Sequence, residues 1–188
     1  GLSGSEIELR REETVGPKIG AELRDAAVNS VVSALATLTE VIQSLERKPR
    51  VILAHAATAE EVDWLRSMKK SGYDVWGETC PHYAFLTQED YNREPSLYQV
   101  NPPLRMLPDV LAVRQGLADG ALDFLHTDHA PHTRAEKGSE HPPSGIAGIE
   151  WLAPLALRLV HEGVLTWERY VAVTCGRAAE CYRMQGRG

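Results

Sequence analysis

Short apolar runs and longer amphipathic stretches alternate along this chain. Each apolar run is only a few residues long and ends at a polar or turn-forming residue, which is the pattern of a buried strand. The longer stretches place apolar residues three and four positions apart, as amphipathic helices do. The pattern predicts strands at 51–54, 73–76, 97–100 and 122–125, and helices at 22–45, 58–71, 108–117, 151–161, 166–173 and 176–182.

Strands that alternate with longer helices predict an α/β fold with a parallel sheet. Each predicted strand ends at polar residues, and in TIM-type (β/α)8 barrels the catalytic groups emerge at the ends of the strands. We therefore predict one domain over residues 1–188 that forms about half of such a barrel. Residues 1–20 have no clean period and are expected to be a loop.

Composition narrows the function classes. The 188 residues carry 20 Lys and Arg against 26 Asp and Glu, a net charge of −6, so no basic stripe favours nucleic acid. No apolar run reaches the roughly 18 residues that a membrane-spanning helix needs. The three cysteines form no Cys-x-x-Cys pair, so we expect reduced thiols in a cytoplasmic protein, with a bridge between Cys175 and Cys181 left open.

Polar or ionisable side chains follow every predicted strand. His55 comes after the first, and Asp128 comes after the last, within the string Thr-Asp-His-Ala-Pro-His. The other strand-end groups are Glu78, His82, Asn101 and His132. Each alone is most often a polar turn residue, but the strand ends of one barrel converge on one face. Imidazoles with a carboxylate suit a divalent transition metal, most often zinc, so the repetition favours a metal site.

Five short motifs then point to a family. They are HAATAE at 55–60, ETCPHY at 78–83, NPPLR at 101–105, DHAPHT at 128–133 and SGIAGIE at 144–150. From about residue 50 to about residue 187 the chain resembles the dihydroorotases of the amidohydrolase superfamily. The string DHAPHT is the most diagnostic, whereas ETCPHY is shared with allantoinases.

The resemblance implies a metal-dependent hydrolase of cyclic amides with two Zn²⁺ ions in a complete site. His55 matches a metal ligand at the end of the sixth barrel strand. Asp128 matches a ligand at the end of the eighth strand that is also the general base. His82 and Glu78 match no metal ligand of the family, and His82 is expected to be structural or to support the ligands.

The resemblance also implies a substrate site and a reaction. Its substrate-binding positions would be Asn101, His132, Ser144 and Gly145. The first two match residues that hold the carboxylate-bearing ring, and the last two match a backbone segment that closes over it. The implied reaction interconverts dihydroorotate and N-carbamoyl-aspartate in pyrimidine synthesis.

Several family features have no counterpart before His55. The family uses a His-x-His pair on the first strand, a bridging Lys or Asp on the fourth, a His on the fifth and an Arg for the substrate carboxylate. Residues 1–54 contain no His, and the chain begins at Gly1 without an initiating Met. We therefore expect a piece of a longer protein that covers about strands six to eight, without the first half of the barrel and without the family's β-sandwich.

Four alternatives stay open at this point. The chain could come from an allantoinase, from a dihydropyrimidinase or hydantoinase, from a non-catalytic dihydroorotase-like scaffold, or from a plain α/β domain. The resemblance leaves room for a homo-oligomer or for a partner enzyme of pyrimidine synthesis beside the small-molecule substrate. A substrate panel and a metal measurement would separate these readings.

Overall fold

The computed structural model describes residues 17–184 and residue 186. Helix α1 (Pro17–Ser44) begins before the predicted residue 22, so residues 17–20 are helical and the predicted loop is wrong there. Proline suits the first helical turn because that turn needs no bonded N–H and because its φ is already helical. The rest of the predicted loop, residues 1–16, lies outside the described residues.

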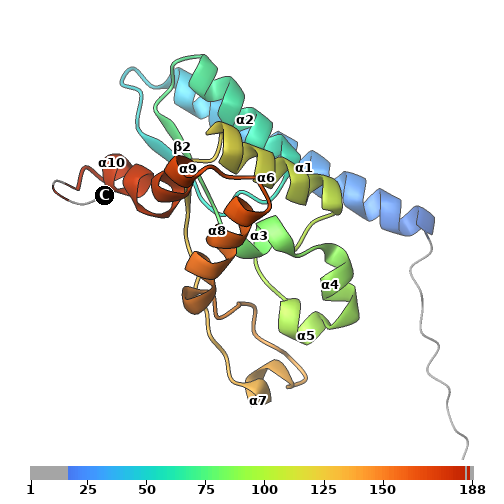
Figure 1. Ribbon diagram of the computed structural model, residues 1–188. Coiled ribbons are helices and arrows are strands. Elements are labelled where there is room, and N and C mark those ends of the chain that lie inside the picture. The colour runs from blue at the N-terminus through green and yellow to red at the C-terminus, as the bar shows by residue number, and fades with distance from the viewer. Residues whose placement is uncertain (1–16, 185, 187–188) are drawn as a thin grey trace, which may run out of the picture.

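Within the described residues, three parallel strands form a sheet in the order β1 (Val51–Leu53), β2 (Val75–Thr79) and β3 (Phe124–Leu125). Helix α2 (Ala59–Lys70) connects β1 to β2, and α6 (Leu107–Asp119) precedes β3. Helix α2 packs against α1 on one side, against α6 on the other, and against β2 (Figure 1). The predicted α/β class and the parallel sheet are confirmed.

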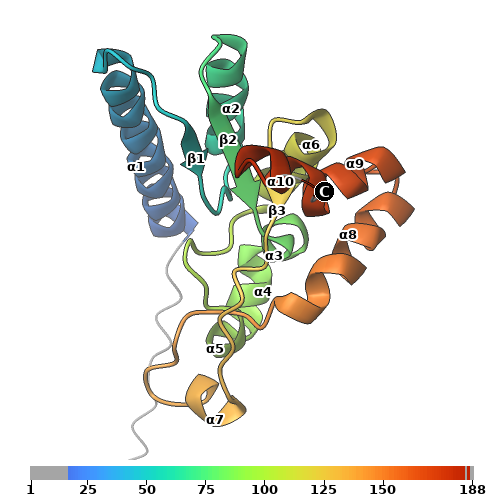
Figure 2. The ribbon, with the colours of Figure 1, turned by 90° about the vertical axis from the view of Figure 1, so that its left-hand side faces the viewer.

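The other elements are short helical segments. They are α3 (Pro81–Phe85), α4 (Gln88–Arg93), α5 (Pro95–Tyr98), α7 (Arg134–Lys137), the 3-10 turn Ile149–Trp151, α8 (Leu152–His161), α9 (Trp167–Val171), the π-helical turn Ala172–Gly176 and α10 (Arg177–Cys181). The segment from α3 to α5 and the helix α7 lie at one end of the molecule, beyond the carboxyl ends of the strands (Figure 2). These segments therefore surround the end of the sheet at which catalytic groups are expected.

Three of the strand predictions need correction, and one of these is the last strand, which begins at Phe124 and not at residue 122. The predicted strand 97–100 is wrong, because Pro95 opens a helical turn that runs to Tyr98, so the described sheet has three strands and not four. The second strand starts later than predicted, at Val75, because the Tyr73 N–H still bonds to the Met68 carbonyl at the end of α2 (3.1 Å). It also continues through Gly77, where a Cβ would stand 2.3 Å from Leu65 Cδ1, so only glycine lets α2 pack this closely on β2.

Helix α2 has the ends that its sequence predicts. Thr58 accepts a hydrogen bond from the Glu61 N–H (3.2 Å), and the Glu61 carboxylate accepts from the Thr58 N–H (2.9 Å), which is a capping box. At the other end Gly72 has a φ of 81°, as helix-terminating glycines often do. The face between these ends buries Val62, Leu65 and Met68 in the core.

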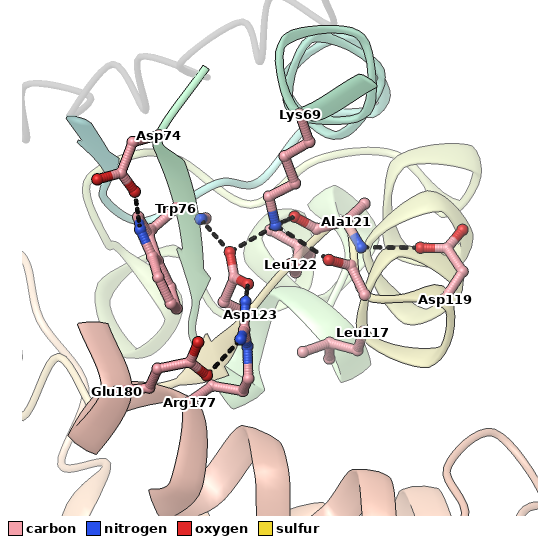
Figure 3. Close-up of polar contacts among 12 residues, drawn as sticks. Lys69, Asp74, Trp76, Leu117, Asp119, Ala121, Leu122, Asp123, Arg177 and Glu180 are labelled. Atoms are coloured by element: carbon pink, nitrogen blue, oxygen red, sulfur yellow. Dashed lines mark hydrogen bonds and ion pairs between the residues drawn. The ribbon is translucent and has the colours of Figure 1, made fainter. Parts of the chain in front are cut away.

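A network of ion pairs ties the helices to the amino ends of the strands (Figure 3). Asp123, whose side chain is 1% exposed, directly precedes β3 and accepts from Lys69 Nζ (2.6 Å), Arg177 (2.6 Å) and the Gly77 N–H (2.9 Å). The guanidinium of Arg177 also stacks on the Trp76 ring, 4.3 Å from its centroid. This network lies at the end of the sheet opposite to the predicted site, so its role is in stability.

Two further sequence expectations can be compared with the structure. All three cysteines are free, so the bridge that stayed open between Cys175 and Cys181 is not formed. Among the described helices, none is both long enough and apolar enough to cross a membrane.

Candidate metal centre at the strand ends

Hydrogen bonds beyond the formal strand ends hold the site residues in register. The Ala56 N–H donates to the Glu78 carbonyl (2.9 Å), and the His126 N–H donates to the Thr79 carbonyl (3.0 Å). The Thr79 hydroxyl donates to the Ala56 carbonyl (2.7 Å). Because these bonds continue the parallel ladder, the residues that follow the three strands are held side by side.

Two histidines meet at this edge of the sheet. His55 follows β1 and His126 follows β3; their rings stack with centroids 4.7 Å apart, and His55 Nδ1 lies 2.8 Å from His126 Nε2. The backbone of His55 has a φ of 56°, in the left-handed region that costs a non-glycine residue about 1 kcal/mol or more. Strain of this kind is concentrated at functional sites, where it aims a side chain.

Cys80 completes this first group, and the Glu78 carboxylate lies beside the two histidines. Glu78 Oε1 lies 3.3 Å from His126 Nε2 and 3.6 Å from His55 Nδ1. Cys80 Sγ lies 3.2 Å from His126 Nε2. Burial, reinforced by the Asp128 and Glu78 carboxylates, raises the pKa of the Cys80 thiol, while burial lowers the pKa of His126. With no cation beside it the thiol is therefore protonated, and a cation is what would stabilise the thiolate.

A second group shares Cys80 with the first. Ligand atoms of Cys80, His82 and Asp128 lie within 4.8 Å of one another, as do those of His55, Cys80 and His126. Burial lowers the pKa of His82 to about 4, and its Nε2 is buried with no hydrogen-bond partner within the described residues. His82 is thus a neutral imidazole with a free nitrogen, which is the form that binds metals.

Asp128 takes a left-handed backbone as well, with a φ of 43°. Its N–H donates to His126 Nδ1 (3.2 Å), which places the proton of a neutral His126 on Nε2. The two predicted metal ligands, His55 and Asp128, therefore lie at the same end of the sheet but in different ligand groups, and His126 and Cys80 stand between them.

Three of the four predicted substrate-binding residues are brought together. His132 Nε2 donates to the Ser144 carbonyl (3.2 Å), and the Gly145 N–H donates to the Gln99 carbonyl (2.8 Å). Gly145 has a φ of 138°, and a Cβ there would stand 2.5 Å from Ala130 Cβ, so the position requires glycine. His132, Ser144 and Gly145 thus belong to two segments that pack on each other directly after Asp128.

The fourth residue, Asn101, is exposed on the loop that follows α5. The next residue anchors this loop, because Tyr83 Oη in α3 donates to the Pro102 carbonyl (2.7 Å). The strand that was expected to carry Asn101 into the site is absent, so a loop anchored by α3 positions it instead.

The sequence interpretation missed His126 and Cys80. Each directly follows a strand, Cys80 after β2 and His126 after β3, and His126 stands two residues before Asp128. Cys80 was considered only as a reduced thiol. The sequence does place both residues at the ends of strands. That position indicates a shared site only once β2 is known to lie between β1 and β3.

The curated relatives of this chain are dihydroorotases. No family model matches the chain. A curated dihydroorotase of Endomicrobium trichonymphae is 41% identical over 139 residues, which are 72% of this chain and 33% of that protein. A dihydroorotase of Geobacillus thermodenitrificans is 37% identical over 163 residues, or 85% of this chain and 38% of that protein.

Solved structures give the same picture of the fold. The dihydroorotase of Saccharomyces cerevisiae, solved with 5-fluoroorotic acid, superposes with a TM-score of 0.73 at 18% identity over 81% of this chain and 43% of that one. The L-hydantoinase of Arthrobacter aurescens superposes with a TM-score of 0.72 at 27% identity over 84% of this chain and 35% of that one. The chain spans about a third of the length of the curated relatives it matches. By sequence and fold, the chain belongs to the dihydroorotase family of amidohydrolases.

Proposed function

We propose that this chain is the part of a dihydroorotase that supplies about strands six to eight of a (β/α)8 barrel, and that the whole protein hydrolyses dihydroorotate to N-carbamoyl-aspartate. One observation carries the proposal: His55 and Asp128 follow the two outer strands of a single parallel sheet and lie at the same end of it. Curated dihydroorotases at 37–44% identity support the same activity.

The residues at this edge fit a divalent metal. An imidazole and a carboxylate are donors that zinc accepts readily, and both ligand residues have the left-handed backbone that aims a side chain from a strand end. His55 and Asp128 would hold two Zn²⁺ ions together with ligands from strands outside these 188 residues. When bound, the metal would polarise the ring carbonyl and lower the pKa of the attacking water.

Asp128 is the proposed general base. Its carboxylate would accept the proton of the attacking water and pass it to the ring nitrogen that leaves, which is the transfer that opening an amide ring requires. The hydrogen bond from its own N–H to Nδ1 of His126, two residues earlier in the same segment after β3, fixes the local backbone.

The segments after Asp128 are the proposed substrate clamp. His132, Ser144, Gly145 and Asn101 lie on loops at the same end as the ligands. His132 donates through Nε2 to the Ser144 carbonyl, which orients its ring, and the donor left for a substrate carboxylate is the side-chain amide of Asn101. Donors on a loop beside the metal suit the carboxylate of dihydroorotate better than a neutral ring.

The test is a substrate panel on the protein in its full reading frame, with zinc present. Dihydroorotate is expected to turn over faster than dihydrouracil, hydantoin or allantoin. Turnover of dihydrouracil or hydantoin without dihydroorotate would instead favour a dihydropyrimidinase or hydantoinase, which the structural neighbours of those names support. Zinc binding without any turnover would favour a non-catalytic scaffold that binds enzymes of pyrimidine synthesis.

The same preparation addresses the remaining proposals. Sedimentation would report whether the protein forms a homo-oligomer, and fractionation would test the expected cytoplasmic location. Metal analysis would count the zinc ions for each complete site, for which the proposal expects two.

A further inference from the structure

The end of the sheet carries more ligand groups than His55 and Asp128. His55, Cys80 and His126 follow β1, β2 and β3 in turn, and their ligand atoms lie within 4.8 Å of one another. Glu78 Oε1 lies 3.3 Å and 3.6 Å from the two imidazole nitrogens. We propose that this chain binds a thiophilic divalent metal ion, Zn²⁺ above all, through His55, Cys80 and His126, with Glu78 as the fourth ligand.

The spacing of the donor atoms fits a tetrahedral ion. Bond lengths of 2.0–2.1 Å to nitrogen and about 2.3 Å to sulfur place neighbouring ligand atoms of a tetrahedron roughly 3.3–3.7 Å apart. The structure gives 3.2 Å from Cys80 Sγ to His126 Nε2, 3.3 Å from Glu78 to His126 and 2.8 Å from His55 Nδ1 to His126 Nε2. These three pairs, all of which include His126 Nε2, lie within about 0.5 Å of the separations that a tetrahedral ion requires.

The chemistry of the donors selects the kind of ion. One thiolate, two imidazoles and one carboxylate form a soft to intermediate set that suits Zn²⁺, Co²⁺ or Cd²⁺ and not Mg²⁺ or Ca²⁺, which take oxygen ligands. Cys80 is completely buried, whereas the side chains of His55 and His126 are about 33% and 27% exposed. The ion would therefore enter from the histidine side and displace the thiol proton as it binds.

Binding also changes one internal hydrogen bond. His126 Nδ1 now accepts from the Asp128 N–H at 3.2 Å, so a ligating Nε2 requires the His126 proton to move to Nδ1 and that long bond to open. The freed N–H belongs to Asp128. One long hydrogen bond is thus exchanged for metal–ligand bonds.

A neighbouring imidazole supports a cation in this place. His82 shares a ligand group with Cys80 and Asp128, is 5% exposed, and has a buried Nε2 without a hydrogen-bond partner among the described residues. A buried ring nitrogen normally has a hydrogen-bond partner, so Nε2 of His82 is available as a further ligand for an ion held by Cys80. The proposed ligand set of His55, Glu78, Cys80 and His126 goes beyond the proposed function, since only His55 among them matches a metal ligand of the family.

Spectroscopy of the 188-residue chain titrated with Co²⁺ tests the proposal without any assay of hydrolysis. Tetrahedral visible bands and a near-ultraviolet charge-transfer band from thiolate to cobalt are expected, and Zn²⁺ should displace both. Cys80→Ser should remove the charge-transfer band. Loss of an outer-shell partner weakens metal binding about 10–100-fold, so loss of Cys80 or of His126 (His126→Ala) should weaken it by more than about 100-fold. Cys175→Ser, a matched change of an exposed cysteine, should leave the spectrum unchanged.

Several results would contradict the proposed metal site. The unmodified chain could show no charge-transfer band, which needs no variant and so does not depend on how Cys80→Ser folds. The band could persist in Cys80→Ser and vanish in Cys175→Ser. Asp128→Asn could abolish binding while Cys80→Ser and His126→Ala leave it unchanged, which would assign the ion to the family ligands alone. A protein that binds cobalt as expected but opens no ring would contradict the proposed function and leave this site standing.

Discussion

Asp123 offers the sharpest test of what holds this fold together. Its carboxylate is 1% exposed and sits between Lys69 and Arg177 while it accepts from the Gly77 N–H, so one side chain links α2, β2, β3 and α10 (Figure 3). We expect Asp123→Ala to be among the most destabilising single changes in the chain.

The magnitude follows from the groups that the change leaves behind. Breaking a buried ion pair costs about 3–5 kcal/mol because the remaining charge is uncompensated. The Lys69 and Arg177 side chains are 25% and 32% exposed, so water relieves part of that cost. The Gly77 N–H, however, loses its carboxylate acceptor, and an unpaired buried donor costs about 1–3 kcal/mol. The two effects together give roughly 3–5 kcal/mol.

Urea unfolding followed by circular dichroism measures the change. Asp63→Ala is the control, because Asp63 is 73% exposed and pairs with Arg66 on the surface, where such pairs are worth about 0–1 kcal/mol. Asp123→Asn should fall between the two, since the amide oxygen can still accept from the Gly77 N–H. If Asp123→Ala cost no more than Asp63→Ala, the network would not stabilise the fold and the reasoning would be refuted.

Three further changes test separate features, each by the free energy of unfolding. Gly145→Ala should cost at least about 1 kcal/mol more than Gly163→Ala, because both have a positive φ but only at Gly145 would the new Cβ clash with a facing alanine; equal costs would contradict the close approach. Thr58→Ala should cost about 1 kcal/mol through loss of the cap of α2, whereas Thr37→Ala on the exposed face of α1 should be near neutral. The pKa of His82 is lowered to about 4 against about 6.5 in the unfolded chain, so the unfolded chain binds more protons between these values. With metal chelated, stability should therefore fall by up to about 3 kcal/mol as the pH drops from about 6.5 to about 4, and a slope unchanged in His82→Gln would refute this.

Local chemistry explains which parts of the fold could be predicted from the sequence. The strand at Val51 and the start of α2 at Thr58 were predicted because an apolar run and a capping box are complete within a few residues. The strand at 97–100 was mistaken because a four-residue apolar run has no period of its own, and Pro95 sets a helical turn there. The length of β2 was harder to predict from the sequence. The strand runs through Gly77, and it is the close packing of α2 that requires a glycine there.

The candidate site likewise contains residues that the sequence predicts and residues that it does not. His55 and Asp128 were found through motifs, which are local strings. His126 and Cys80 can be recognised as site residues only from the strand order β1-β2-β3, which brings the three strand ends together. No single segment of the sequence encodes that order. The contact between His132 and the Ser144 carbonyl likewise joins residues that only the packing of two loops brings together.

The central claim is that Asp128 serves as the general base of a dihydroorotase. The most direct measurement is the rate of dihydroorotate ring opening by the full-length protein with zinc, compared with Asp128→Asn and with Asp63→Asn, the same change at an exposed position. Loss of a general base lowers the rate by about 10²–10⁴-fold, so the account predicts that loss for Asp128→Asn and near-normal turnover for Asp63→Asn. Dihydroorotate turnover that survives in Asp128→Asn would contradict the account.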